Sequence, residues 1–184
     1  MVTDPGVCQE TRRSGRMPVM EVTIRPLVAE EWQLWRELRL QSLADSPDAF
    51  RPTLEQEEER PDDWWMELVA STVEHPRGGL WVAETDGQMV GMVFGRLSPG
   101  FEVLDVGAMW VAPRCRRGGV GAGLLGAVME WARASGAIRA ELWVTEENAS
   151  ALPLYRKVGF TPSADTQPLR EESSLIVRKL GTEL

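Results

Sequence analysis

The chain has 184 residues, of which 43% are apolar, and its formal net charge is −8 at pH 7. This length and composition predict one folded domain. The acidic balance argues against a nucleic-acid partner, which would require a basic face. The sequence contains no run of about 18 apolar residues that would predict a membrane span. Two cysteines, Cys8 and Cys115, give no disulfide framework and no metal-ligand spacing, so we expect a reduced, cytoplasmic protein without a bound metal.

The N-terminal third is predicted to form one strand and one helix after a disordered leader. We assign the leader to residues 1–18 and a single domain to residues 19–184. The stretch "VMEVTIRPL" alternates apolar and polar residues up to Pro26, which is typical of a strand. The stretch "AEEWQLWRELRLQSLADSP" has an apolar face at nearly helical spacing, and Pro47 ends the helix.

A second helical region over about 53–72 precedes a β-hairpin. Pro61 interrupts the helical region, and the acidic run Glu57–Glu59 is predicted to face solvent because block charge is usually solvated. The following stretch, "GLWVAETDGQMVGMVFGRL", contains two β-rich runs on either side of Asp86-Gly87. This dipeptide suits the positive φ angles of a type I′ turn and predicts a hairpin.

The second half of the chain is predicted to contain a strand–helix–strand crossover. "FEVLDVGAMWVAP" forms the third strand of an antiparallel meander, a helix runs to Gly136, and "IRAELWVT" forms a buried strand. The crossover makes these two strands parallel neighbours. A short helix ending at Gly159 and two final strands complete a mixed α/β fold.

The stretch "APRCRRGGVGAGLL" is the first candidate for a binding site. It lacks the G-x-x-x-x-G-K-[ST] string of a P-loop. Its Gly121–Gly126 segment matches the letters of a dinucleotide fingerprint, but it lies within the helix instead of opening directly from a strand. The run Arg116-Arg117-Gly118-Gly119-Val120-Gly121 fits a third pattern, R/Q-x-x-G-x-G/A, at the point where the helix begins.

Free main-chain N–H groups and the macrodipole make such a helix start favourable for an anion. Glycine allows a diphosphate to approach the backbone, and arginines add charge-assisted contacts. A glycine-rich turn with surface arginines and no ligand is the alternative interpretation of the loop taken alone.

A second motif, "NASALPLYRKVGF" at residues 148–160, fits N-x-x-A-x-x-L-Y-x-x-x-G-F. With both motifs at this spacing, and with the same order of elements over about 20–180, the sequence resembles the GNAT superfamily of acetyl-CoA-dependent N-acetyltransferases. The resemblance implies a mostly antiparallel sheet of about six to seven strands with about four helices, and a splay between the fourth and fifth strands. It also implies acetyl-CoA as the co-substrate.

The resemblance implies a cofactor site with two parts. The main-chain groups of Met109 and Val111 would bind the pantetheine arm and the thioester, while their side chains pack. The pyrophosphate would lie on the loop residues Arg116, Arg117, Gly118, Gly119, Val120 and Gly121. Asn148 would be a further cofactor contact, left free in its loop if Ser150 is the N-cap of the next helix.

Tyr155 and Asp105 are the catalytic candidates that the resemblance implies. Tyr155, the single tyrosine in the chain, would be the general acid for the departing thiolate or would orient it. Asp105 would be the base, six residues before Val111, with Glu102 or a water chain as alternatives. Cys115 has no histidine near it in sequence, which argues against a cysteine nucleophile.

The resemblance leaves two functions open. One is an N-acetyltransferase acting on a primary amine of a small molecule or a protein through direct attack in a ternary complex. The other is an inactive acyl-CoA-binding sensor of the same fold. The sequence identifies neither the acceptor nor the oligomeric state, and a homodimer stays open.

Overall fold

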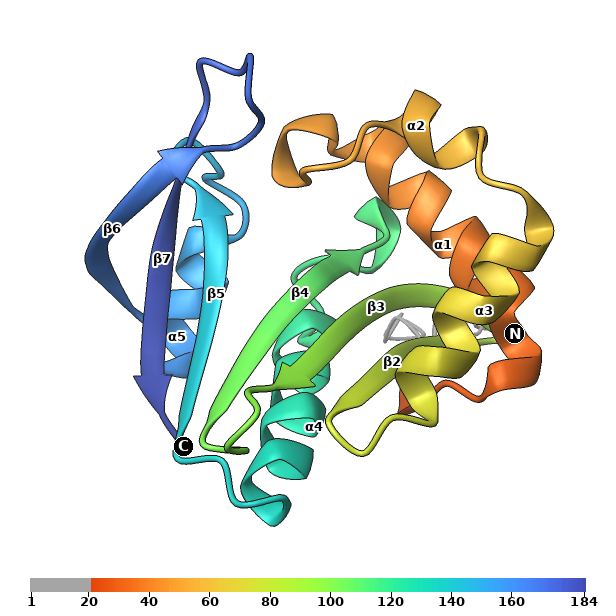
Figure 1. The fold of residues 1–184 in the computed structure, drawn as a ribbon, viewed down its shortest axis with the longest axis horizontal. Coiled ribbons are helices and arrows are strands. Elements are labelled where there is room, and N and C mark those ends of the chain that lie inside the picture. The colour runs from red at the N-terminus through yellow and green to blue at the C-terminus, as the bar shows by residue number, and fades with distance from the viewer. Residues whose placement is uncertain (1–20) are drawn as a thin grey trace, which may run out of the picture.

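The computed structural model describes residues 21–184, so the leader predicted over residues 1–18 lies outside the described residues. Seven strands form one sheet in the order β1-β2-β3-β4-β5-β7-β6 (Figure 1). The strands are β1 (Thr23–Pro26), β2 (Gly78–Thr85), β3 (Gln88–Leu97), β4 (Val103–Val111), β5 (Arg139–Thr145), β6 (Thr161–Pro168) and β7 (Ile176–Glu183). The α-helices are α1 (Trp32–Asp45), α2 (Leu54–Glu58), α3 (Asp62–Val73), α4 (Val120–Ala134) and α5 (Leu152–Val158).

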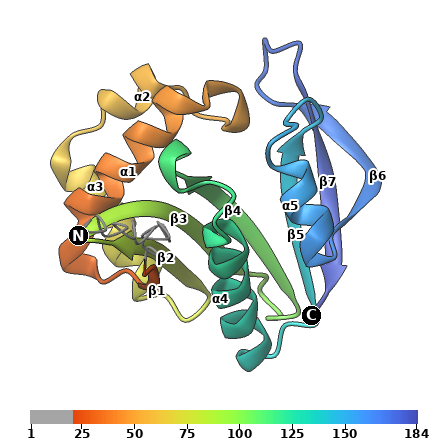
Figure 2. The same cartoon turned by 180° about the vertical axis from the view of Figure 1, so that it is seen from behind.

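Strands β1 to β4 form the antiparallel half of the sheet that the sequence predicts. The β2–β3 connection has positive φ at Asp86 (50°) and Gly87 (70°), as a type I′ turn requires. Helices α1 and α3 cover one face of this half, and α4 covers the other (Figures 1 and 2). A Cβ atom added at Gly95 of β3 would lie 2.4 Å from Val128 of α4, so the helix packs directly on the strand. This half therefore holds most of the apolar core.

The helical segments match the predicted breaks but not every predicted exposure. Pro61 separates α2 from α3 and is the N-cap residue of α3. The prediction that Glu57 faces solvent is wrong, because its side chain is buried while Glu58 and Glu59 are exposed. Glu57 is turned toward α1, where the guanidinium of Arg39 lies 3.8 Å from its carboxylate. An isolated buried charge is costly, and the arginine offsets part of that cost.

The centre of the sheet contains the predicted parallel pair and the predicted splay. Strands β4 and β5 pair only over Val103–Val106 and Arg139–Leu142. Beyond Val106, β4 stays paired with β3 and β5 stays paired with β7, so the two strands separate toward their C-terminal ends. The sheet is consequently divided into a β1–β4 half and a β5–β7 half (Figure 1).

The β5–β7 half is smaller and has α5 on the same face as α4 (Figure 2). Gly159 ends α5 with a φ of 104°, which glycine adopts without strain. Within residues 21–184, no helix is long and apolar enough to cross a membrane.

Candidate active site

At the splay, the facing edges of β4 and β5 each have no strand partner toward their C-terminal ends. Past Val106, the edge of β4 that faces β5 has no strand partner among residues 21–184, and the same is true of β5 past Leu142. A β-bulge lies within this segment, because Ala108 and Met109 together oppose Val93 of β3, and Ala108 has a φ of 49°. Bulges re-aim the backbone and are common beside active sites. The segment Gly107–Val111 is thus an open edge that an extended ligand can pair with.

The glycine-arginine loop leads from the end of β4 into α4. Gly119 is the N-cap residue of α4 and has a φ of 88°, and the residues from Arg116 to Gly119 are exposed. The first N–H groups of a helix have no intrahelical partner, and here they begin at an exposed, glycine-lined turn. The helix start predicted within the glycines is confirmed, at Val120.

The three arginines of this loop have different surroundings. Arg114 donates to the side chain of Gln88 at 2.8 Å. Arg116 forms an ion pair with Asp45 at the end of α1 and donates from Nε to the Val111 carbonyl at 2.9 Å. Arg117 has a φ of 66°, and its side chain forms no ion pair within residues 21–184. Arg117 is therefore the loop arginine whose guanidinium stays available to a phosphate.

Asp45 connects α1 to the glycine-arginine loop, which the sequence alone did not reveal. Its Oδ2 accepts from Trp110 Nε1 at 2.9 Å and also pairs with Arg116. Desolvation acts to raise the pKa of Asp45, but the hydrogen bonds from Trp110, Ser46 and Arg116 outweigh it and lower that pKa below its ordinary value. The carboxylate is thus ionised and fixes the position of the Arg116 side chain.

Gly121 lies in the first turn of α4, where space is limited. A Cβ atom there would be 2.9 Å from Leu154 of α5 and 3.1 Å from the Met109 side chain. Val111 also lies nearby, at 3.8 Å. The side chains of Met109 and Val111 therefore pack against the first turn of α4. The need for glycine at position 121 comes from this packing, whereas the need at position 119 comes from φ.

Tyr155 lies on α5, a short helix that packs behind the sheet. Its ring makes an edge-to-face contact with Phe160, with 6.0 Å between the ring centroids, and its side chain is buried. Burial raises the pKa of Tyr155 to about 12. Among residues 21–184 its hydroxyl forms no hydrogen bond, and the hydroxyl oxygen is not fully buried. The phenol is therefore protonated at neutral pH and free to donate.

Asn148 has a different local role from the one expected. Its Oδ1 accepts from the Ala151 N–H at 3.0 Å and from the Ser150 hydroxyl at 2.8 Å. The expectation that Ser150 caps α5 and leaves Asn148 free in the loop is wrong. The Asn148 side chain itself satisfies one of the free N–H groups that precede α5.

Asp105 lies in a row of charged side chains across the sheet, in which two neighbouring carboxylates are flanked by two basic residues. It is opposite Arg96 of β3 and Glu141 of β5, and Glu141 pairs with Lys179 of β7 at 3.1 Å. Its side chain reaches solvent, yet partial desolvation between the strands, together with the Glu141 charge, raises the pKa of Asp105. Glu102, the alternative base, precedes β4, and its carbonyl accepts from the N–H groups of Ile138 and Arg139. Asp105 is the carboxylate with the more perturbed surroundings.

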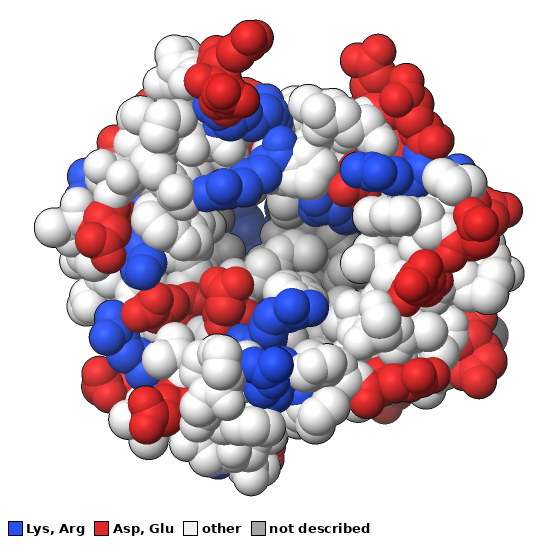
Figure 3. Space-filling view, viewed as in Figure 1, with Lys and Arg blue, Asp and Glu red and all other residues white. Residues whose placement is uncertain are grey.

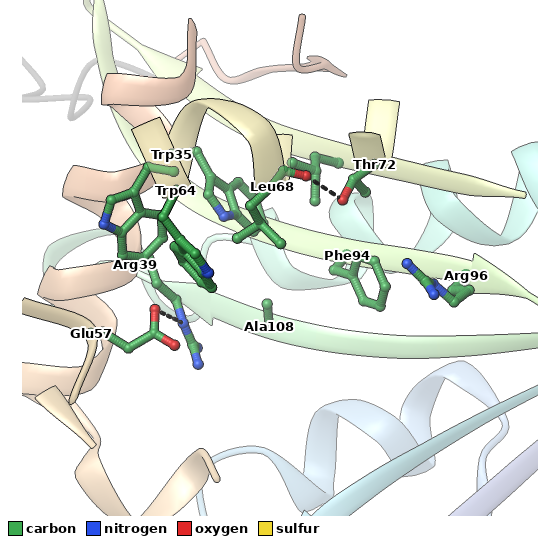
Figure 4. Close-up of a pocket in the computed structure, with 11 residues that line it drawn as sticks. Trp35, Arg39, Glu57, Trp64, Leu68, Thr72, Phe94, Arg96 and Ala108 are labelled. Carbon is green, nitrogen blue, oxygen red and sulfur yellow. Dashed lines mark hydrogen bonds and ion pairs between the residues drawn. The ribbon is translucent and has the colours of Figure 1, made fainter. Parts of the chain in front are cut away.

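A cavity of about 270 Å³ lies beside the bulge, between helices α1 to α3 and strands β2 to β4. Its lining includes Trp35, Arg39, Glu57, Phe94 and Ala108 (Figure 4). Sequence reasoning missed Arg39 and misassigned Glu57. One signal was present, because Arg39 lies one turn after Trp35 on the buried face of α1.

The two halves of the molecule also meet at the open end of the splay. Arg170, in the β6–β7 loop, donates to the carbonyls of Arg51 and Phe50 at 2.9 Å each. Thr145 donates to the Asp48 carbonyl at 2.6 Å. Figure 3 shows a hollow between the two halves, with basic and acidic side chains around it. The splay is thus bridged at its far end and stays open at its centre.

Comparison with known proteins identifies the family. The profile of the acetyltransferase (GNAT) family matches residues 32–160, so the chain belongs to this family. A mycothiol acetyltransferase from Beutenbergia cavernae is 29% identical over 136 residues, which are 74% of this chain and 43% of that protein. The chain thus spans less than half of that relative's length.

Solved structures confirm the fold. A GNAT-family acetyltransferase from Streptococcus pneumoniae has a TM-score of 0.76 at 20% identity, over 89% of this chain and all of that one. A putative acetyltransferase from Salmonella typhimurium, solved with its cofactor acetyl-CoA, has a TM-score of 0.67 at 18% identity, over 89% of this chain and 94% of that one. The resemblance found from the two sequence motifs is therefore confirmed, and with it acetyl-CoA as the family's co-substrate.

Proposed function

We propose that the chain transfers the acetyl group of acetyl-CoA to a primary amine by direct attack within a ternary complex. The observation that carries this proposal is the open edge of β4 at Gly107–Val111, which leads directly into the exposed N-terminus of α4. An extended pantetheine arm fits the open edge, and a diphosphate fits the helix start. The residues present are compatible with acetyl-CoA on both counts.

In this proposal the cofactor is held mainly by the backbone. Main-chain groups of Met109 and Val111 bind pantetheine and the thioester. The N–H groups of Gly118, Gly119, Val120 and Gly121 bind the pyrophosphate, and Arg117 adds a charge-assisted contact. The guanidinium of Arg116 is already paired with Asp45, so Arg116 contributes by holding the loop in place. Asn148 would reach the cofactor through its amide nitrogen, since its Oδ1 already accepts two hydrogen bonds.

The reaction needs a free amine, a stabilised oxyanion and a departing thiol. Asp105 takes a proton from the attacking amine, directly or through water. A main-chain N–H at the β4 bulge donates to the developing oxyanion, a contribution of about 3–4 kcal/mol in well-studied cases. The C–N bond forms first, the oxyanion then collapses as the C–S bond breaks, and coenzyme A departs as a thiolate that takes its proton from solvent, while Asp105 returns the amine proton to solvent.

Tyr155 assists this departure as a hydrogen-bond donor. Its pKa of about 12 lies above the roughly 8.5 of an ordinary thiol. A phenol that is a weaker acid than the thiol stabilises the thiolate by donating a hydrogen bond, whereas complete proton transfer would be uphill. This supports the orienting role of Tyr155 over that of a full proton donor.

Direct attack is favoured over an acetyl-cysteine route. Cys115 is 4% exposed and lies at the end of a 3₁₀ turn, where no cofactor or acceptor can reach its sulfur without displacing the loop. Initial rates measured over a grid of acetyl-CoA and amine concentrations test this point. Intersecting lines are expected, and parallel lines would indicate a covalent acetyl-enzyme.

The test of the function has two stages. Acetyl-CoA is first titrated while the melting temperature is followed, because a ligand of the native state raises it. A panel of amines is then assayed for release of free thiol. Binding with no thiol release from any amine would favour the acyl-CoA-binding sensor, and absence of binding would reject both functions.

A further inference from the structure

The cavity beside the β4 bulge has aromatic walls and a charged end. Trp35, Trp64 and Phe94 contribute rings, and Ala108 of the bulge completes the side nearest the open edge of β4 (Figure 4). Its volume of about 270 Å³ corresponds to about nine water molecules at about 30 Å³ each. A small molecule, or one end of a larger one, fits this space and reaches the strand on which the thioester is proposed to lie.

Two of the residues that line this cavity each hold a buried hydrogen-bond donor without a partner. Nη1 of Arg39 and Nε1 of Trp65 are buried, and neither forms a hydrogen bond with any residue in the part of the chain that the structure describes. Arg39 is 9% exposed, and Trp65 is fully buried. Buried donors of this kind normally have a partner, so each of them calls for an explanation.

Glu57 compensates Arg39 only in part. The closest approach of its carboxylate to the guanidinium is 3.8 Å, too long for a hydrogen bond, and Arg39 also stacks over Phe50 at 4.7 Å. Burial lowers the pKa of Arg39 and raises that of Glu57, and in each case it outweighs the attraction of the partner. Figure 4 shows Arg39 extending past Glu57 toward β4, where Ala108 lies.

The charge of the lining has the sign that suits an anion. Arg39 and Arg96 carry positive charge and Glu57 carries negative charge, so the lining has a formal charge of +1 in a chain whose net charge is −8. Asp105, which is opposite Arg96 on the neighbouring strand, is not part of the lining. A group with two acceptor oxygens and one negative charge would match both donors and the charge.

We infer that the acceptor is a small amine that also carries a carboxylate, as an amino acid does, and that Arg39 is the residue that selects it. This inference rests on the proposed acetyl transfer. The carboxylate binds Arg39 Nη1 and the indole N–H of Trp65, the apolar part of the acceptor packs on Trp35 and Phe94, and the amine points toward Ala108. The carboxylate takes no part in bond making, since only the amine nitrogen bonds to the acetyl carbon.

Matched pairs of acceptors test the selectivity. We expect kcat/KM for L-phenylalanine and L-leucine to exceed that for L-phenylalaninamide and L-leucinamide by about 10- to 100-fold, the range of a charge-assisted hydrogen bond to a buried group. The amine of an amino-acid amide is less basic than that of the free amino acid, so a larger fraction of it is unprotonated at neutral pH. The supply of free amine alone would therefore favour the amides. Equal values for acid and amide would overturn the inference.

Variants locate the selectivity without unfolding the cavity. In Arg39→Met/Glu57→Met both charges are replaced together, so no unpaired buried charge remains. The ratio of acid to amide should fall to within about twofold of unity, because the anion partner is lost. The matched control is Arg25→Met/Glu31→Met, which removes another arginine–glutamate pair outside the cavity and should keep the wild-type ratio. A ratio unchanged in the Arg39→Met/Glu57→Met variant would contradict the inference.

Binding in the absence of acetyl-CoA separates this inference from the proposed function. 3-Phenylpropionate, which has a carboxylate but no amine, should change the tryptophan fluorescence of the wild-type protein at concentrations where 3-phenylpropionamide does not. If no amine releases thiol, the proposed function fails while this titration still tests the carboxylate site. Equal binding of the two probes would reject the carboxylate site even if acetyl transfer is observed.

Discussion

The cofactor side and the acceptor side of the proposed site are built from different parts of the chain. On the cofactor side, the open edge of β4 and the start of α4 present main-chain groups from one continuous stretch, Gly107–Gly121. On the acceptor side, the cavity is lined by side chains from α1, α2, α3, β2 and β3, and it shares only Ala108 of β4 with the cofactor side, so its lining spans 73 residues from Trp35 to Ala108.

The difference explains which side can vary among proteins of one fold. Main-chain recognition depends on backbone geometry and constrains few side chains apart from glycine, so a shared co-substrate can be bound with a short motif. Side-chain recognition can change one residue at a time without disturbing the sheet. The predictions below test whether the two sides are separable in this way, from the largest expected effect to the smallest.

Gly119→Val should damage the cofactor side most. A β-branched residue does not tolerate a φ of 88°, so the first N–H groups of α4 would turn away from the pyrophosphate. Losing two such contacts at about 1.5–3 kcal/mol each predicts an affinity for acetyl-CoA about 10²- to 10⁴-fold weaker by calorimetry. Gly126→Ala is the control, because a Cβ atom there has no heavy atom within 4 Å. Unchanged affinity in Gly119→Val would place the pyrophosphate elsewhere.

Tyr155→Phe should reduce turnover while leaving both binding sides intact. The ring keeps its contact with Phe160, and only the hydroxyl is lost. The loss of a hydrogen-bond donor to a developing negative charge predicts a fall in kcat of about 10²-fold, with acetyl-CoA affinity within a few-fold of wild type. The free energy of unfolding should change by less than about 1 kcal/mol, because the hydroxyl has no partner within residues 21–184. Full activity across the pH range would remove Tyr155 from the mechanism.

Asp45→Asn tests the link between α1, which lines the acceptor cavity, and the glycine-arginine loop. Asparagine can still accept from Trp110 but no longer offers a charge to Arg116. A partly exposed pair contributes up to about 1 kcal/mol, so KM for acetyl-CoA should rise about fivefold with kcat nearly unchanged. Asp62→Asn, which removes a longer and more exposed pair with Arg36, serves as the comparison. A fall in kcat without a change in KM would instead assign Asp45 to the acceptor side.

The pH dependence of kcat/KM should report the charge row around Asp105. The base must be ionised, so activity falls as the pH drops through a pKa that lies above the ordinary 3.8. Glu141→Gln removes a negative charge that raises this pKa, and the acidic limb should move to lower pH. Lys179→Met removes a positive charge that lowers it, and the limb should move to higher pH.

Each displacement should be less than about one pH unit for charges this exposed. The Asp105→Asn variant should lose activity chiefly at lower pH, where the amine most needs a base. A limb that stays in place in all three variants would identify a different titrating group, with Glu102 as the next candidate.

Much of the fold follows from local chemistry in the sequence. The Asp86-Gly87 turn, the break at Pro61 and the helix ends at Gly136 and Gly159 depend on residues whose backbone preferences are strong. The parallel pairing of β4 and β5 follows because a strand–helix–strand crossover has few alternatives. Where a preference is weaker, the sequence misled, as at Ser150, since Asn148 can satisfy the same N–H groups.

By itself, then, the sequence determined the glycine-arginine loop, because the loop depends on contacts within one stretch of chain, and the resemblance carried by its two motifs implied the family and the splay beside the loop. The tertiary structure decided the rest. It turned Glu57 inward to meet Arg39, and it paired Arg116 with Asp45 so that Arg117 stays available. The surroundings of each of these charges come from segments distant in sequence, and a charge pattern along the chain does not encode which distant partner will be buried beside it.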